Sequence, residues 1–329
     1  MPIARPKALH VNPVYRSYFA DPFVWRVGDG YFAIGTGALE ASGQTVGRIF
    51  PVLRSEDFFH WKFASNAMVR PDPALGTHFW APEIAARDDR FYLYYSVGHA
   101  DKNHQLRVAS GEDPEGPYED CGHALLNTSD CPFAIDPHPF QDDDGQWYLF
   151  YARDFLDVTA NARAGTAVMV ARMKSPTGLE NPGKVVVRAR HDWQRFQLNR
   201  PMYDRVWDWH TIEGPFLQKH DGRYYCFYSG GRWESDNYGV DYCVADNVMG
   251  PYSDESTATG PRVLHTVPNQ LIGPGHNSIV TGPDDETEFI VYHAWDKEMK
   301  ARQMFIDRLI WTSSGPRCES EFGRQKSEV

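Results

Sequence analysis

Short hydrophobic runs rich in aromatic and β-branched residues, separated by polar turns, make up most of the chain. The turns draw on 27 glycines and 23 prolines, which punctuate the apolar runs at close spacing. Segments with the 3.6-residue period of an amphipathic helix are scarce. Short strands bounded by Gly, Pro and Asp are typical of all-β proteins, so the pattern predicts an all-β fold.

One pattern occurs five times: a polar Asp/Gly turn followed by an aromatic strand. The copies read GDGYFAIGTG from 28, DDRFYLYYSVG from 88, DDDGQWYLFYAR from 142, DGRYYCFYSGG from 221 and DDETEFIVYHAW from 284. Aligned on the strand, the equivalent aromatic residues are Phe32, Tyr92, Tyr148, Tyr225 and Phe289. Several short antiparallel strands per repeat favour a propeller over a helical array.

The repeat therefore predicts a five-bladed β-propeller, formed by a single domain over residues 1–329. The propeller itself is expected over about residues 12–316, followed by a short polar tail. The alternative is that aromatic hairpins are simply common in β proteins. A second recurring turn motif, in the same order along the chain, argues against that alternative.

A short motif opens the strand before each aromatic strand. The five copies are ADPFV (20–24), WAPEI (80–84), IDPHPF (135–140), IEGPF (212–216) and GHNSI (275–279). Their polar residues, predicted to occupy equivalent positions, are Asp21, Glu83, Asp136, Glu213 and His276. The first strand of a propeller blade lines the central channel, so these side chains are expected to converge on one axial cavity.

Carboxyl groups that share a partly desolvated cavity cannot all ionise independently, so the pKa values of some rise and those of others fall. Glycoside hydrolysis uses such a pair: an acid that protonates the departing oxygen and a carboxylate that activates water or attacks the anomeric carbon. Each Asp-Pro also has a structural interpretation as a turn or strand start. As a set at equivalent positions, Asp21, Asp136 and Glu213 favour catalysis.

Charge and composition exclude several partners. The net charge of −11 and a pI near 5.6 argue against nucleic acid and anionic membranes. No apolar run is long enough to span a bilayer, and the start lacks a signal peptide, which predicts a cytoplasmic protein, or a secreted one if a leader was removed. Five cysteines without metal-ligand spacing predict free thiols.

The five motifs, in this order, resemble glycoside hydrolase family 43, the propeller hydrolases that act on α-L-arabinofuranosides and β-D-xylosides. The resemblance spans about residues 12–316. It implies an inverting mechanism with Asp21 as general base, Glu213 as general acid and Asp136 as the carboxylate that orients the acid and modulates its pKa. Inversion requires a water between the two catalytic carboxyl groups.

Further residues carry over from the resemblance as sugar contacts. Trp80 matches an aromatic residue that faces the sugar, and Arg302 matches an arginine that reaches substrate hydroxyls. A core tryptophan and a surface arginine are the structural alternatives. Phe23 and Trp209 are added as candidate substrate contacts, whereas Glu83 is expected to be a structural partner.

His276 matches an axial histidine that helps to hold a water-coordinated cation, often calcium, and is also a candidate substrate contact. One imidazole is a weak calcium signature, because calcium prefers several oxygen ligands. The chemistry itself requires no cofactor, so any calcium near the axis is expected to be structural or electrostatic.

Two features bear on the substrate. The polar ending CESEFGRQKSEV leaves no room for the C-terminal β-sandwich of many family xylosidases. The insert at 189–215, with Trp193, Trp207 and Trp209, is expected to cap the pocket partly, or alternatively to fold on the propeller side. The sequence leaves exo and endo action open, as well as the oligomeric state.

The sequence thus predicts an inverting exo-acting α-L-arabinofuranosidase working on arabinan or arabinoxylan oligosaccharides. A β-D-xylosidase or an endo-arabinanase with the same mechanism is the alternative. A sugar-binding propeller without turnover disagrees with the presence of all three carboxyl groups. Retaining fructosidase-type propellers are disfavoured because their NDPNG and EC motifs are absent.

Overall fold

The structure is a computed structural model that describes residues 10–38 and 47–319. In these residues the chain forms 22 strands, and its only helices are two 3-10 turns, η1 (Pro73–Leu75) and η2 (Asp192–Gln194). The prediction of an all-β protein is confirmed.

The strands form five sheets, in which neighbouring strands are antiparallel and follow chain order, except that in the third sheet the last hairpin joins an earlier strand through a parallel bridge. The first holds β1 (Ala20–Val27), β2 (Gly30–Thr36), β3 (Arg48–Ser55) and β4 (Lys62–Val69). The second holds β5 (His78–Arg87), β6 (Arg90–His99), β7 (Lys102–Gly111) and β8 (Glu119–Ala124). The third holds β9 (Ala134–Gln141), β10 (Trp147–Phe155), β11 (Gly165–Ser175), β12 (Gly178–Leu179), β13 (Lys184–Arg188), β14 (Arg195–Met202) and β15 (Arg205–His210). The fourth holds β16 (Ile212–His220), β17 (Arg223–Gly230) and β18 (Gly239–Ala245). The fifth holds β19 (Ile272–Thr281), β20 (Glu288–Trp295), β21 (Arg302–Thr312) and β22 (Gly315–Glu319).

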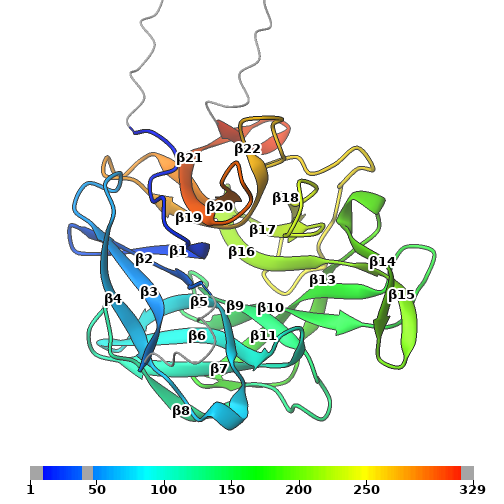
Figure 1. The fold of residues 1–329 in the computed structure, drawn as a ribbon, viewed down its shortest axis with the longest axis horizontal. Coiled ribbons are helices and arrows are strands. Elements are labelled where there is room, and N and C mark those ends of the chain that lie inside the picture. The colour runs from blue at the N-terminus through cyan, green and yellow to red at the C-terminus, as the bar shows by residue number, and fades with distance from the viewer. Residues whose placement is uncertain (1–9, 39–46, 320–329) are drawn as a thin grey trace, which may run out of the picture.

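The sheets are arranged around a central axis, with the first strand of each sheet innermost (Figure 1). Around the axis, β1 contacts β5, β5 contacts β9, β9 contacts β16, β16 contacts β19, and β19 contacts β1. This closed circle is the predicted β-propeller arrangement.

The repeated aromatic strand is the second strand of every sheet. Its aligned aromatic residues pair with the first strand in antiparallel register: Phe32 with Trp25, Tyr92 with Ala85, Tyr148 with Phe140, Tyr225 with Gln218 and Phe289 with Val280. The hydrophobic core is divided accordingly into five main clusters, one between each pair of neighbouring sheets. Burial of apolar side chains between sheets holds the circle together.

Each innermost strand carries the same β-bulge, at which two residues of the strand lie opposite one residue of its neighbour. The first bulge residue has a positive φ in all five strands: Asp21 (51°), Ala81 (45°), Asp136 (57°), Gly214 (55°) and His276 (50°). These are the equivalent positions. The predicted equivalence of Glu83 and Glu213 with the other three was therefore wrong: Glu213 precedes its bulge residue by one position, and Glu83 follows its own by two.

Side chains of other sheets accept hydrogen bonds from the backbone N–H groups at these bulges. His293 Nδ1 accepts from Asp21 (3.0 Å), Thr36 Oγ1 from Ala81 (2.8 Å), Asp136 Oδ2 from Gly214 (2.9 Å) and Ser229 Oγ from His276 (2.7 Å). These side-chain hydrogen bonds satisfy backbone donors that the strand ladder leaves free at the bulges. They also join neighbouring sheets close to the axis.

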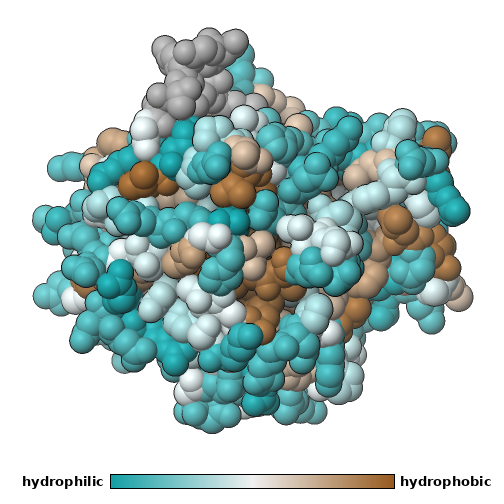
Figure 2. Space-filling model, turned by 90° about the horizontal axis from the view of Figure 1, so that it is seen from below, coloured by the Kyte–Doolittle hydropathy of each residue, from teal (hydrophilic) through white to brown (hydrophobic). Residues whose placement is uncertain are grey.

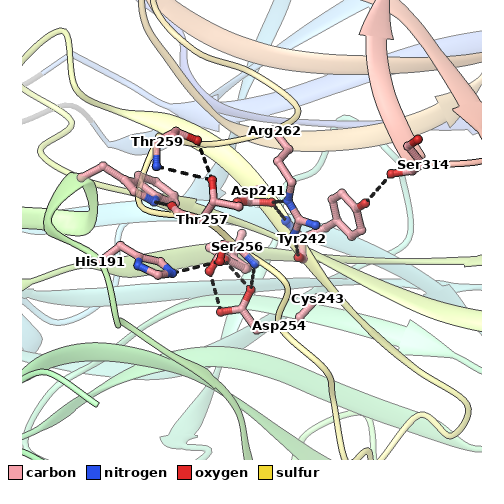
Figure 3. Close-up of polar contacts among 12 residues, drawn as sticks. His191, Asp241, Tyr242, Cys243, Asp254, Ser256, Thr257, Thr259, Arg262 and Ser314 are labelled. Carbon is pink, nitrogen blue, oxygen red and sulfur yellow. Dashed lines mark hydrogen bonds and ion pairs between the residues drawn. The ribbon is translucent and has the colours of Figure 1, made fainter. Parts of the chain in front are cut away.

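The insert between β13 and β16 begins on the side of the propeller. His191 Nε2 lies 3.0 Å from the carbonyl oxygen of Ser256, and Trp193 Nε1–H donates to that of Thr257. Figure 3 shows the surrounding network, in which Arg262 Nε donates to the buried Asp241 carboxylate at 2.6 Å. The first part of the insert is therefore anchored to the 254–262 loop, as the alternative interpretation predicted.

The face seen in Figure 2 is mostly hydrophilic, with hydrophobic residues in separate small groups. No helix in the described ranges is long and apolar enough to cross a membrane. All five cysteines are free thiols, as predicted.

Candidate active site

A cavity of about 1350 Å³ lies at the inner strands and is open to solvent on one side. Asp21 from β1, Asp136 from β9, Glu213 from β16, His276 from β19 and Arg302 from β21 all line it. The fold therefore brings together five predicted site residues that are up to 281 positions apart in the chain.

Asp21 is surrounded by positive and neutral nitrogen groups. Arg302 Nη1 donates to its Oδ1 at 3.2 Å, and His276 Nδ1 lies 3.4 Å from the same oxygen. Burial raises the pKa of Asp21, but the positive charge of Arg302, with smaller contributions from the neighbouring histidines, outweighs burial and holds the pKa well below its usual range. Asp21 is consequently a carboxylate even in mildly acidic solution.

His293 holds the backbone of Asp21 in place. Its Nδ1 accepts the backbone N–H of Asp21 at 3.0 Å and lies 3.3 Å from Asp21 Oδ1. Burial lowers the pKa of His293 to about 4, which keeps the imidazole neutral and able to accept this bond. His293 thereby stabilises a backbone conformation, φ 51° at Asp21, that non-glycine residues rarely adopt.

Asp136 and Glu213 face each other across the neighbouring part of the cavity. Asp136 Oδ2 accepts the N–H of Gly214, the residue after the acid, at 2.9 Å. Burial raises the pKa of Asp136 well above its usual value, and the negative charges of Glu213 and Asp21 add to this. Burial also raises the pKa of Glu213 to about 7, although a hydrogen bond from Tyr238 opposes the rise.

The cavity thus contains an ionised carboxylate and a carboxyl group that keeps its proton near neutral pH. That division is what acid–base hydrolysis of an acetal requires.

A comparison with protein-family models matches residues 10–316 to "Glycosyl hydrolases family 43". The chain belongs to this family. Family 43 membership confirms the resemblance seen in the sequence and shows that the protein is a glycoside hydrolase by family.

Relatives and a solved structure agree with that assignment. The chain is 28% identical over 322 residues to a beta-D-galactofuranosidase of Aspergillus niger, covering 92% of this chain and 83% of the relative. It is 26% identical over 318 residues to an extracellular exo-alpha-(1->5)-L-arabinofuranosidase of Cellvibrio japonicus, covering 90% and 84%. The crystal structure of a thermostable family-43 glycoside hydrolase superposes with a TM-score of 0.78 at 26% identity, covering 94% of this chain and 96% of that one.

Two predicted sugar contacts lie at the cavity. Trp80 lines it and stacks on His104 at a centroid distance of 3.8 Å. Arg302 also lines it and is held between Asp21, the Tyr18 hydroxyl (2.7 Å) and the Trp233 ring (4.4 Å). Their roles toward a sugar stay predictions.

The other two candidate contacts, Phe23 and Trp209, do not lie at the cavity, and their predicted role as sugar contacts is corrected here. Phe23 follows the β1 bulge residue by two positions and packs beside Trp25 and against two core clusters, one between the first and second sheets and one between the fourth and fifth. Trp209 is 2% exposed and is covered by Tyr203 and Arg200. Neither is among the described residues that line the cavity.

The second part of the insert reaches the cavity. Phe196, Gln197 and Arg200 of β14 line it, and Arg200 Nη2 donates to Asp101 Oδ2 of the β6–β7 turn at 2.6 Å. The Arg200 guanidinium also stacks on Phe196 at 4.6 Å. The β14–β15 hairpin is thus connected to the second sheet at the cavity wall.

Sequence reasoning missed Tyr238, His293, Tyr18 and Trp233. Tyr238 directly precedes β18 and stands in no recurring motif. His293 had a signal: with the bulge included in the alignment, it occupies in the last sheet the place that Ser229 occupies in the fourth.

The predicted calcium finds little support from protein ligands. His276 turns Nδ1 toward Asp21 and Arg302, and burial lowers its pKa, which favours a neutral imidazole. Among the described residues, no group of three or more His, Cys, Asp or Glu side chains is arranged to hold a metal ion. These side chains do not fit a site with several protein oxygens, and an ion coordinated by water at His276 stays a prediction.

Proposed function

We propose that the protein is an inverting, exo-acting α-L-arabinofuranosidase with Asp21 as base, Glu213 as acid and Asp136 as the residue that positions and tunes the acid. The observation that carries this proposal is the convergence of Asp21, Asp136 and Glu213 on one cavity, where the pKa of Asp21 is displaced downward and that of Glu213 upward.

The mechanism follows from these protonation states. Asp21 accepts a proton from a water molecule as its oxygen attacks the anomeric carbon. Glu213 donates its proton to the glycosidic oxygen as the bond to that carbon breaks. One displacement inverts the anomeric configuration and leaves Asp21 protonated and Glu213 ionised, and exchange with solvent restores both.

Asp136 assists the acid in two ways. Its hydrogen bond with the Gly214 N–H holds the backbone immediately after Glu213, and its carboxyl group beside Glu213 favours the protonated acid. Gly214 suits this place because a Cβ there would lie 3.1 Å from the His276 ring and because its φ is +55°.

The number of blades belongs with this proposal. We assign one blade to each of the five sheets, since each contributes one bulged strand to the cavity or its wall. A single domain over residues 1–329 stays a prediction.

A furanoside substrate is supported by the two relatives, whose names specify a galactofuranoside and an arabinofuranoside. Exo action is supported by the β14–β15 hairpin and its Arg200–Asp101 ion pair at the cavity wall. The compartment stays open, since the sequence predicts the cytoplasm and the Cellvibrio relative is named as extracellular.

The test is initial rates on aryl α-L-arabinofuranoside, aryl β-D-galactofuranoside and aryl β-D-xylopyranoside, with Asp21→Ala as control. Fastest turnover of the arabinofuranoside, absent in the control, supports the proposal, and proton NMR of the first-released sugar reports inversion. Faster turnover of the galactofuranoside would reassign the substrate to a galactofuranoside. Faster turnover of the xyloside would favour the xylosidase alternative. Cleavage of internal bonds in arabinan alone would identify an endo-acting enzyme, and binding without turnover a lectin.

A further inference from the structure

Tyr238 is a buried tyrosine whose hydroxyl group contacts the proposed acid. It directly precedes β18, is 1% exposed, and donates from its hydroxyl to Glu213 Oε1 at 2.8 Å. It does not line the cavity, so it approaches the carboxyl group from the protein side.

The packing around Tyr238 fixes its ring. The ring is stacked on His293 with a centroid distance of 5.9 Å and an angle of 7°. On another side it lies against Gly275, where a Cβ would approach Tyr238 Cε1 to 2.1 Å, so that only glycine leaves room. The ring of Tyr238 therefore contacts His293, which holds the backbone of Asp21, while its hydroxyl contacts Glu213.

The protonation of Tyr238 is equally constrained. Burial raises the pKa of its phenol well above the usual value, and the charges of Glu213, Asp21 and Asp136 raise it further. The phenol therefore keeps its hydrogen and points it at Glu213 Oε1. In a protonated carboxyl group the carbonyl oxygen is a much stronger acceptor than the hydroxyl oxygen, so the bond from Tyr238 favours Oε1 as the carbonyl oxygen and the other oxygen as the carrier of the acid's own proton.

We propose that Tyr238 is a positioning residue that directs the acidic proton of Glu213 to Oε2, the oxygen free to face the glycosidic bond, and that limits how tightly the acid holds that proton. The assignment rests on the proposed role of Glu213 as general acid. Other groups that interact electrostatically with Glu213 come from four different strands: Asp21 (β1), Asp136 (β9), Arg200 (β14) and Arg302 (β21).

The first test is Tyr238→Phe, which keeps the ring between His293 and Gly275 and removes only the hydroxyl. Loss of a donor to the charged form makes Glu213 a weaker acid, so the basic limb of kcat/KM moves to higher pH by about one unit. With the proton no longer directed, kcat falls about tenfold on alkyl glycosides and much less on dinitrophenyl glycosides, which need little protonation.

A matched control is Tyr228→Phe. Tyr228 is a fully buried tyrosine of β17 in the same sheet, and its hydroxyl donates to Asp254 at 3.2 Å rather than to the cavity. It loses a comparable buried hydrogen bond, so we expect similar destabilisation but an unchanged pH profile. A merely structural role of Tyr238 would make the two variants alike.

The second test needs no substrate. The Glu213 carboxyl carbon is labelled with ¹³C and titrated by NMR in the wild-type protein and in Tyr238→Phe, with its resonance assigned by its absence in Glu213→Gln. The inference expects Glu213 to titrate at higher pH in Tyr238→Phe. An unchanged Glu213 titration overturns it, whatever sugar the enzyme cleaves, and equal kcat losses on alkyl and dinitrophenyl glycosides overturn it as well.

Discussion

Two pairs of buried ionisable groups share strands β5, β9 and β16 but differ in what they can do. In one pair, His138 of β9 contacts Glu83 of β5. In the other, Asp136 of β9 faces Glu213 of β16. The two β9 residues are only two positions apart, and all four carry side chains that acid–base catalysis uses.

The Glu83–His138 pair has its hydrogen-bonding groups satisfied inside the protein. His138 Nε2 accepts the N–H of Leu217 in β16 at 3.0 Å, so its proton is on Nδ1, from which it donates to Glu83 Oε2 at 2.7 Å. Glu83 is 6% and His138 3% exposed, and neither lines the cavity. The pair connects three sheets and has no access to a substrate.

The Asp136–Glu213 pair consists of two acidic groups that cannot neutralise each other's charge. Both carboxyl groups line a cavity that a substrate can enter, and burial, together with the negative charge of Asp21, raises the pKa values of both. The difference arises from the bulge rather than from residue type. Side chains at or just before the bulge residue reach the cavity, and those two positions beyond it are packed between sheets.

The largest effect is expected at the base. Asp21→Asn should lower kcat about 1,000-fold on every glycoside that the enzyme cleaves, because an amide cannot take the water's proton. Steady-state rates on aryl and alkyl substrates measure it. Turnover near the wild-type rate would remove Asp21 from the base role.

The next effect depends on the leaving group. Glu213→Ala should lower kcat about 100-fold on alkyl glycosides and less than about tenfold on dinitrophenyl glycosides, since a good leaving group departs without protonation. The ratio of the two rates is the measurement. Equal losses on both substrates would contradict the assignment of the acid.

A smaller change is expected from Asp136→Asn, with a displaced pH profile. Asp136 and Glu213 interact electrostatically, and Asn cannot take up the negative charge that Asp136 gains when it ionises. We therefore expect the pKa of Glu213 and the basic limb to move to lower pH, opposite in sign to Tyr238→Phe, and kcat to fall about tenfold. The free energy of unfolding should not fall, because a repulsion is removed. A profile of unchanged shape would contradict the modulating role.

The smallest kinetic effect is expected at the self-satisfied pair. Glu83→Ala should change kcat less than about threefold yet lower the free energy of unfolding by about 1–3 kcal/mol, because it leaves the His138 Nδ1–H buried without an acceptor. Urea unfolding and initial rates, measured on one preparation, test both parts. A large loss of kcat in a variant that stays folded would erase the distinction between the two pairs.

Much of the fold was predictable because each repeat is specified by the residues of its own turn and strand. An Asp/Gly turn before an aromatic strand specifies a hairpin, and five such hairpins need a circular arrangement to bury both faces. Asp21 and Asp136 were predictable as cavity residues for the same reason.

The remaining details depend on register. A bulge shifts every later side chain to the opposite face, so Phe23 could not be placed by counting, and Glu83 was aligned with residues that it does not match. Trp209 required knowledge of which face of the β14–β15 hairpin is covered. Tyr238 reaches Glu213 from a segment with no repeat, and nothing in its own sequence distinguishes it from the other buried tyrosines.

The hydrogen bond from Asp21 N–H to His293 has a consequence for the order of folding events. It joins the first strand of the propeller to the last sheet across 272 positions of the chain, and Arg302 reaches Asp21 across 281. The base therefore obtains its conformation and its charge partner only when the two ends of the circle meet. Recovery of activity during refolding should accordingly lag behind formation of the individual sheets and report on closure of the circle itself.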